Sequence, residues 1–424
     1  MKAYKKVLKN GLRVVAIPMK DNLTVTVMVL VEAGSKYENT KINGLSHFLE
    51  HMCFKGTKKR PNASDVSREL DGLGAEYNAF TSQEFTGYFA KVGKRSFKKA
   101  LDIVSDLYLN PLFKNDEINK EKGVIIEEIN MYEDMPQRTV HDVFMELLHG
   151  KQSAGMTILG PKENIKKFDD AYFRTYRDKH YVAEATTVIV SGNIEKNEIF
   201  TQVADAFAHM PTQKKVLKQK TVDAQKSPAV KLRYKKTDQS HMVFGVRGLH
   251  LSHKEYMTAE VLTNVLGGGM SSRLFSKLRD EMGVCYYVRA FNDAYTDHGS
   301  VGVWTGVNVA RTKEVVGVLI DEFKRLRDEL VSAEELKKVQ EYMVGTMYLQ
   351  LESSDSLADH FGFQELFGLE LKTPQVLAKK IRSITVRDIQ RLAQKLFITQ
   401  SLNLAVVGPF QEKDTADFKK LLKL

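Results

Sequence analysis

The segment Leu45-Ser-His47-Phe-Leu-Glu50-His51-Met52 predicts an amphipathic helix whose polar face can bind a metal ion. At about 100° per residue, the two histidines and Glu50 fall on one stripe of such a helix, and the apolar residues of the segment fall on the opposite stripe. Histidines four residues apart lie one turn above each other, so both rings can reach one ion. One face of the helix is therefore expected to pack and the other to do chemistry.

A third metal ligand is expected from a second helix. A catalytic zinc ion usually has three protein ligands and a water molecule, so two histidines are not enough. The run from Asp116 to Tyr132 has helical spacing in its isoleucines, and Glu117, Glu121 and Glu128 share another stripe. Glu127 lies about 100° off that stripe. This second helix therefore offers several carboxylates to the metal.

The order His-x-x-Glu-His, with the glutamate directly before the second histidine, is the inverted zincin signature. With this motif and the later run Val124-Ile-Ile-Glu-Glu128, the chain resembles the pitrilysin-type (M16, inverzincin) zinc metallopeptidases. The similarity is greatest to the short-subunit branch, which includes mitochondrial processing peptidase and its bacterial homologues. The resemblance implies one zinc ion per chain, held by His47, His51 and Glu128, with Glu127 as the alternative ligand. It also implies that Glu121, seven residues before Glu128, supports catalysis.

The chemistry expected of this motif is peptide-bond hydrolysis. Zinc lowers the pKa of a bound water from about 15.7 to about 7 and polarises the scissile carbonyl. Glu50 would then act as the general base on the zinc-bound water and return the proton to the departing amine. We therefore expect a zinc endopeptidase that acts on extended peptides or unfolded protein segments. The alternatives are a noncatalytic structural or assembly subunit, or a peptide-binding module, with the same fold.

Further residues are assigned to the substrate by the resemblance alone. In the family, the segment that contains Asn78 and Ala79 is an edge strand, to which an extended peptide can be added as a further strand. The run Leu278 to Tyr286 matches a family motif in which an Arg and a Tyr bind substrate or stabilise the intermediate. Arg279 and Tyr286 are the matching residues here, and the tyrosine hydroxyl could donate to a developing oxyanion.

The chain repeats one plan of strands and helices at an offset of about 216 to 218 residues, which indicates two similar domains. We expect an α+β fold with a mixed or antiparallel sheet in each domain and helices on one face. The resemblance further implies that the pair forms half of a clamshell. The predicted ranges are 1–210 for a zinc-binding catalytic domain, 211–228 for a linker, and 229–424 for a metal-free repeat domain that carries the Arg/Tyr motif. Only the first half has the histidines, and Thr346 stands in the second where Glu128 stands in the first.

Composition agrees with a large enzyme. The 424 residues exceed what one core usually supports, and 43% of them are hydrophobic. A net charge of +10 is spread along the chain without a nucleic-acid motif, so no nucleic-acid partner is expected. No run is long enough for a membrane span. The two cysteines indicate a reducing compartment, the cytoplasm, with Cys53 expected to pack and not to bind metal. Because one chain carries both the zinc motif and the Arg/Tyr motif, the resemblance implies a homodimer that encloses the peptide in a chamber.

Overall fold

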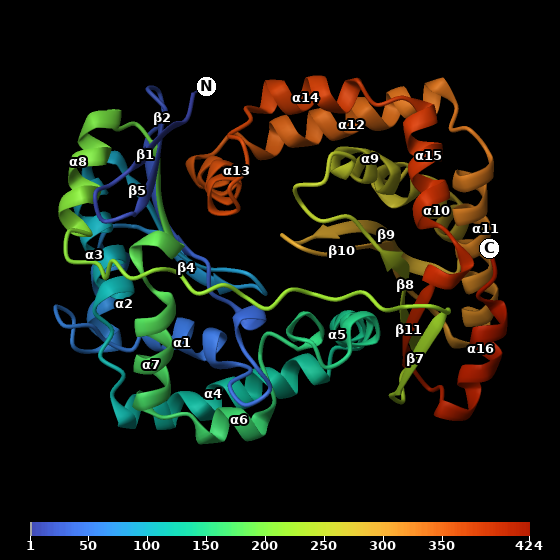
Figure 1. Ribbon diagram of the computed structural model, residues 1–424, viewed down its shortest axis with the longest axis horizontal. Helices are drawn as coiled ribbons and strands as arrows, with labels where there is room; N and C mark the ends of the chain where they lie inside the picture. The colour runs from blue at the N-terminus through green and yellow to red at the C-terminus, as the bar shows by residue number, and fades with distance from the viewer. Residues whose placement is uncertain (1) are drawn as a thin grey trace. The chain divides into compact units, whose positions relative to one another are not determined.

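The computed structural model describes residues 2–424, which form two compact units (Figure 1). Each unit is assembled from three stretches of the chain. The first comprises 2–129, Thr157–Gln219 and Tyr348–Thr373, and the second comprises Asn130–Met156, Lys220–Met347 and Pro374–Leu424.

The first unit is built on a six-stranded mixed sheet. Its strand order is β1-β2-β6-β3-β5-β4, in which β2 and β6 are parallel and all other neighbours are antiparallel. β1 and β2 form an antiparallel hairpin whose turn contains Asn10-Gly11. β4 forms one edge of the sheet. The strands are β1 (Tyr4–Val7), β2 (Arg13–Pro18), β3 (Thr24–Val31), β4 (Glu76–Thr81), β5 (Thr86–Gly93) and β6 (Thr186–Gly192).

Helices cover both faces of this sheet. Alternate residues of β3 point to opposite sides, so Val27 and Val29 join the core beneath α1 and α3, whereas Met28 and Leu30 join a second core. That second core is closed by α13 (Ser354–Leu366), which contributes buried Phe361. The other helices that contribute residues to the unit are α1 (Leu45–Cys53), α2 (Ala63–Gly72), α3 (Phe97–Leu109), α4 (Asn115–Glu133), α6 (Lys162–Lys167), α7 (Asp170–His180) and α8 (Lys196–Ala206).

The second unit repeats this plan on a five-stranded sheet with the order β7-β11-β8-β10-β9. Met242 and Phe244 of β8 face one core, whereas Val243 faces a second core closed by α5 (Pro136–His149). The strands are β7 (Ala229–Tyr234), β8 (Gln239–Arg247), β9 (Cys285–Ala294), β10 (Gly299–Asn308) and β11 (Asn403–Gly408). The further helices are α9 (Tyr256–Gly267), α10 (Arg273–Phe275), α11 (Thr312–Asp328), α12 (Ala333–Gln350), α14 (Pro374–Arg382), α15 (Val386–Leu396) and α16 (Thr415–Leu421). The prediction of two similar α+β halves is confirmed.

The compact units differ from the ranges 1–210 and 229–424 expected from the sequence. Residues 130–156, with α5, pack in the second unit, and residues 348–373, with α13, pack in the first. Each of these helices buries its apolar residues on the sheet of the other half of the sequence. The expectation of helices on one face therefore describes only the helices that come from the same half of the sequence as the sheet they cover. Residues 207–228, which contain the predicted linker, form no helix or strand. No helix within residues 2–424 is both long and apolar enough to cross a membrane.

Candidate metal centre

The helix that carries the two histidines is fixed at its first turn by a buried carboxylate. Glu38 accepts hydrogen bonds from the backbone N–H groups of Gly44 (2.8 Å) and Ser46 (2.6 Å), which have no partner within α1 itself. Gly44 has a φ of 99°, and a Cβ atom there would lie 2.5 Å from the carbonyl oxygen of Leu159. Only glycine fits at this position before the helix. Together, Gly44 and the hydrogen bonds to Glu38 hold the polar face of α1 in one orientation.

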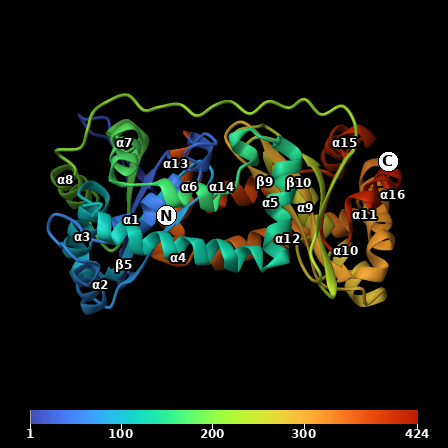
Figure 2. The ribbon, with the colours of Figure 1, turned by 90° about the horizontal axis from the view of Figure 1, so that it is seen from below.

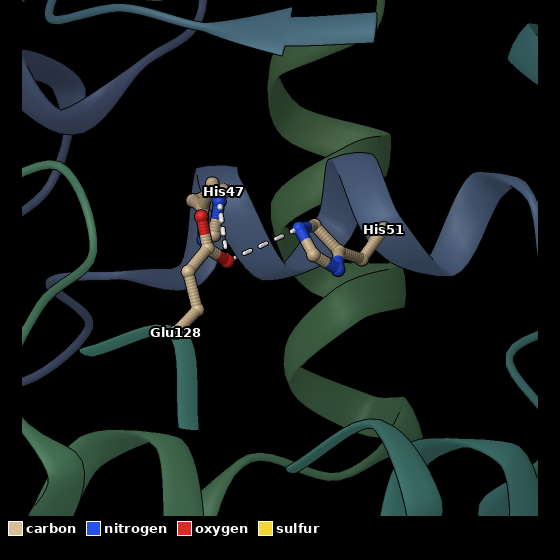
Figure 3. Close-up of side chains that lie close together, drawn as sticks. All are labelled: His47, His51 and Glu128. Atoms are coloured by element: carbon tan, nitrogen blue, oxygen red, sulfur yellow. Dashed lines mark ion pairs between the residues drawn. The ribbon is translucent and has the colours of Figure 1, made fainter. Parts of the chain in front are cut away.

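His47, His51 and Glu128 converge on one point in the first unit (Figure 3). α1 supplies the histidines and α4 the glutamate, and the two helices lie side by side in both ribbon views (Figure 1 and Figure 2). The Nε2 atoms of His47 and His51 lie 3.5 Å and 3.7 Å from Glu128 Oε2. Two donors at about 2.0–2.1 Å from a tetrahedral ion are about 3.4 Å apart. The three side chains therefore fit the ligand set of one zinc ion.

Glu50 lies on the same helix, and one of its oxygens has a defined partner. The hydroxyl of Thr81, the last residue of β4, donates to Glu50 Oε2 at 2.5 Å. Glu50 is only 9% exposed. Burial raises the pKa of this carboxyl group, and the neighbouring Glu128 adds to the rise, whereas Thr81 and His51 oppose it. Within residues 2–424 the other oxygen, Oε1, has no hydrogen-bond partner. A carboxylate with a raised pKa and such an oxygen is suited to accept a proton.

A second carboxylate orients His51. Glu121 is 4% exposed, and its two oxygens contact His51 Nδ1 at 2.9 Å and the ammonium of Lys55 at 2.6 Å. Burial acts to raise the pKa of Glu121, but the hydrogen bonds from His51 and Lys55 bring it below its usual value. The carboxylate therefore accepts the Nδ1 proton and leaves Nε2 of His51 free to face Glu128.

The electrostatics of His47 also suit a ligand. Burial lowers its pKa to about 3, and the charge of His51 contributes to the same shift. The ring of His47 is therefore neutral over the physiological range, as metal binding requires. For His51, burial acts to lower the pKa, but the hydrogen bond to Glu121 and the surrounding carboxylates raise it above the usual value.

The alternatives considered from the sequence lie elsewhere. Glu127 is exposed, and among the described residues the cluster of donor atoms around the histidines contains Glu128. Cys53 is buried, and its thiol donates to the hydroxyl of Tyr88 at 3.4 Å. Burial raises the pKa of this thiol to about 12, so it remains protonated. Cys53 packs in the core.

The residues expected to bind substrate are exposed or half-buried. Asn78 and Ala79 belong to the edge strand β4, and the N–H of Ala79 donates to the side chain of Asn78 at 2.9 Å. In the second unit, Arg279 donates to the carbonyl oxygen of Tyr286 at 2.9 Å, and its guanidinium lies 4.5 Å from the centre of that ring. Tyr286 is 76% exposed. Their roles toward a substrate stay predictions.

Comparison with known proteins assigns the chain to a family. The model of the family described as insulinase (peptidase family M16) matches residues 13–162, and that of the peptidase M16 inactive domain matches 167–343. A protein of Bacillus subtilis, named an uncharacterized zinc protease, is 33% identical over 403 residues, which cover 95% of this chain and 97% of the relative. The chain belongs to peptidase family M16. The predicted resemblance is therefore confirmed.

Other proteins are similar to nearly the whole chain. An uncharacterized zinc protease of Streptomyces coelicolor is 31% identical over 418 residues, covering 96% of this chain and 90% of its own. A crystal structure of a protease from Helicobacter pylori has a TM-score of 0.88 at 23% identity and covers 96% of this chain and 99% of its own. An M16 inactive domain from Pseudomonas fluorescens has a TM-score of 0.90 at 15% identity, with 97% and 98% covered. These two structures are similar in fold.

The two halves of this M16 chain differ in chemistry. In the second half, α9 occupies the place of α1 in the repeat, and its sequence Tyr256–Gly267 contains no histidine. Thr346 of α12 stands where α4 has Glu128, and its hydroxyl donates to a carbonyl oxygen of its own helix. The second half therefore lacks the donor set found in the first.

Two side chains of the centre were not assigned from the sequence. Glu121 contacts both His51 and Lys55. Lys55 lies four residues after His51, and this helical spacing could have been read from the sequence. Thr81 lies at the end of the segment that contains Asn78 and Ala79, but its partner Glu50 is distant along the chain. Only the folded structure brings Thr81 to the centre.

Proposed function

We propose that this M16 protein is a zinc-dependent endopeptidase that hydrolyses extended peptides or unfolded protein segments. The observation that carries the proposal is the convergence of His47, His51 and Glu128 at distances suited to one tetrahedral ion. Glu50 lies on α1, the helix that carries the two histidines. The names of the Bacillus and Streptomyces relatives, both called zinc proteases, support the same assignment.

In the proposed reaction each side chain has a separate task. His47, His51 and Glu128 would hold one zinc ion per chain, and Glu121 would keep the ring of His51 in the required orientation. Bound zinc supplies a lowered pKa for water and a Lewis acid for the scissile carbonyl. Glu50 accepts a proton from the attacking water through its free oxygen and delivers it to the departing amine.

The substrate would be bound mainly through its backbone. β4 is an edge strand, so a peptide can pair with it beside Asn78 and Ala79 without a requirement for one side-chain sequence. Arg279 and Tyr286 are our candidates for further substrate contacts, because Tyr286 is exposed and the half-buried Arg279 lies against its ring. We further propose that two copies of the chain form a homodimer, which sedimentation analysis of the purified protein tests, and that the protein acts in the cytoplasm.

The test of the proposed activity is Glu50→Gln. We expect this variant to bind as much zinc as the wild type, because Glu50 is not in the ligand set, and to lose hydrolysis of a quenched peptide by about 10²- to 10⁴-fold. Zinc is measured by elemental mass spectrometry. Glu163→Gln on α6, which removes an exposed carboxylate, is the matched control and should keep full turnover. A zinc-loaded wild type that binds peptides without cleaving them would indicate the peptide-binding module instead, and a wild type that binds no zinc would indicate a noncatalytic subunit.

A further inference from the structure

We propose that Thr81 is a positioning residue that holds the Glu50 carboxylate in its productive orientation. The inference rests on the proposed role of Glu50 as the general base. It concerns a hydroxyl group that contacts Glu50 and makes no contact with the three ligand side chains among the hydrogen bonds of residues 2–424.

The direction of the hydrogen bond is set by the neighbouring groups. A threonine hydroxyl has one proton to donate. Thr86 lies next to Thr81, with 3.4 Å between the two hydroxyl oxygens, and Thr86 donates its own proton to the carbonyl oxygen of Ala33 at 2.9 Å. An ionised Glu50 has no proton to give. The Thr81 hydroxyl is therefore the donor to Glu50 Oε2, at 2.5 Å.

Thr81 is itself held firmly. It pairs with Thr86 at the end of the β4–β5 ladder, and the following turn is closed by the N–H of Ser82, which donates to the carbonyl oxygen of Phe85 at 2.8 Å. The turn also packs against the backbone of Gly34, where a Cβ atom would come within 2.3 Å of the Ser82 carbonyl oxygen. A hydroxyl mounted on backbone fixed in this way defines one position for the atom it contacts.

The hydrogen bond from Thr81 gives the two oxygens of Glu50 different roles. Oε2 is engaged by Thr81, so Oε1 is the oxygen left to receive the proton of the attacking water. Without the hydroxyl, the carboxylate can rotate about its side-chain bonds, and fewer molecules hold the base in the reactive geometry at any moment. Because Thr81 ends the same edge strand that includes Asn78 and Ala79, the strand proposed to bind peptide also positions the base.

The experiment compares Thr81→Val, which keeps the size and β-branching of the side chain, with Thr81→Ser, which restores the hydroxyl. Quenched-peptide kinetics give kcat and KM, and elemental analysis gives zinc content. Peptide affinity is measured by fluorescence anisotropy in the Glu50→Gln background, with and without Thr81→Val. Thr201→Val, on an exposed face of α8, is the matched control.

We expect Thr81→Val to lower kcat about 10- to 100-fold, the usual effect of losing a hydrogen bond to a charged group. KM and zinc content should stay at their wild-type values, and the double variant should bind peptide as tightly as Glu50→Gln alone. Thr81→Ser should recover most of kcat, and Thr201→Val should change nothing. A Thr81→Val variant with wild-type kcat overturns the inference and leaves the proposed function intact. Loss of zinc or of peptide affinity, or failure of Thr81→Ser to restore kcat, means that Thr81 is only structural and also overturns it. A wild type that binds zinc but cleaves no peptide overturns the proposed function, and the inference with it.

Discussion

Replacing Glu121 by glutamine should weaken zinc binding through His51. The carboxylate of Glu121 accepts from both His51 Nδ1 (2.9 Å) and Lys55 (2.6 Å). A glutamine amide has a single oxygen, and the charged ammonium of Lys55 competes for it more strongly. The amide NH₂ group then faces His51 Nδ1. This donor favours the tautomer with its proton on Nε2, and Nε2 is the atom that faces Glu128.

The size of the effect follows from the contact that is lost. Removal of a partner that orients a metal-binding histidine typically costs 10- to 100-fold in metal affinity, or about 1.4–2.8 kcal/mol. Loss of one hydrogen bond to a charged group, at about 1.5–3 kcal/mol, gives the same range. Glu121 is almost completely buried, so water cannot easily replace the missing acceptor.

The assay is competition for zinc against a chromogenic chelator at neutral pH. Glu117→Gln is the matched control, because Glu117 lies on the same stripe of α4 and pairs only with the exposed Lys120 in the ion pairs of the described residues. A dissociation constant of Glu121→Gln within about twofold of the wild type, less than 0.5 kcal/mol, would refute the argument. An equal loss in Glu117→Gln would do so as well, because it would show that any charge on α4 has this effect.

Three further outcomes are expected. Glu128→Gln should lose most bound zinc, whereas Glu127→Gln should keep it, because among the described residues Glu128, and not Glu127, belongs to the donor cluster with His47 and His51. Elemental analysis of both variants checks this, and the reverse result would make Glu127 the ligand. Dialysis against a strong chelator should abolish peptide hydrolysis and added zinc should restore it, so full activity in protein proven free of metal would contradict the proposed chemistry. Phe361→Ala should lower the free energy of unfolding by about 3–5 kcal/mol, since this fully buried ring closes the core beneath α13. The control is Leu23→Ala, which removes a side chain that is 83% exposed and should change the free energy of unfolding by less than about 0.5 kcal/mol. Urea unfolding measures both variants, and equal effects of Phe361→Ala and Leu23→Ala would refute the packing argument.

The sequence predicted those parts of the fold that follow from local periodicity. The stripe of His47, Glu50 and His51 opposite apolar residues was enough to predict α1, and the same periodicity predicted α4. The repeated order of elements predicted two similar halves, which the two sheets confirm. In each case the signal lies within one helix or one strand, or in the similarity of the halves to each other.

The parts that were not predicted depend on contacts between distant residues. Phe361 belongs to a helix whose apolar residues, such as Leu357 and Phe363, do not form a single narrow stripe, so no pattern names the sheet on which it packs. Threonine at the end of a strand is ordinary, and nothing in the sequence connects Thr81 with Glu50. The choice of Glu128 over Glu127 likewise came from the resemblance, because helical spacing alone offered several carboxylates.

The exchange of α5 and α13 between the halves has a consequence for the newly made chain. During synthesis, the apolar side chains of Ile17, Met28 and Leu30 leave the ribosome more than three hundred residues before α13, which covers them in the finished protein. The amino-terminal half therefore cannot complete its folding as an independent piece, and its unprotected sheet is a site for chaperone binding or aggregation until translation is nearly complete. For the same reason, fragments that stop near residue 210 should be found in inclusion bodies. In the full-length chain, the two halves complete their folding together.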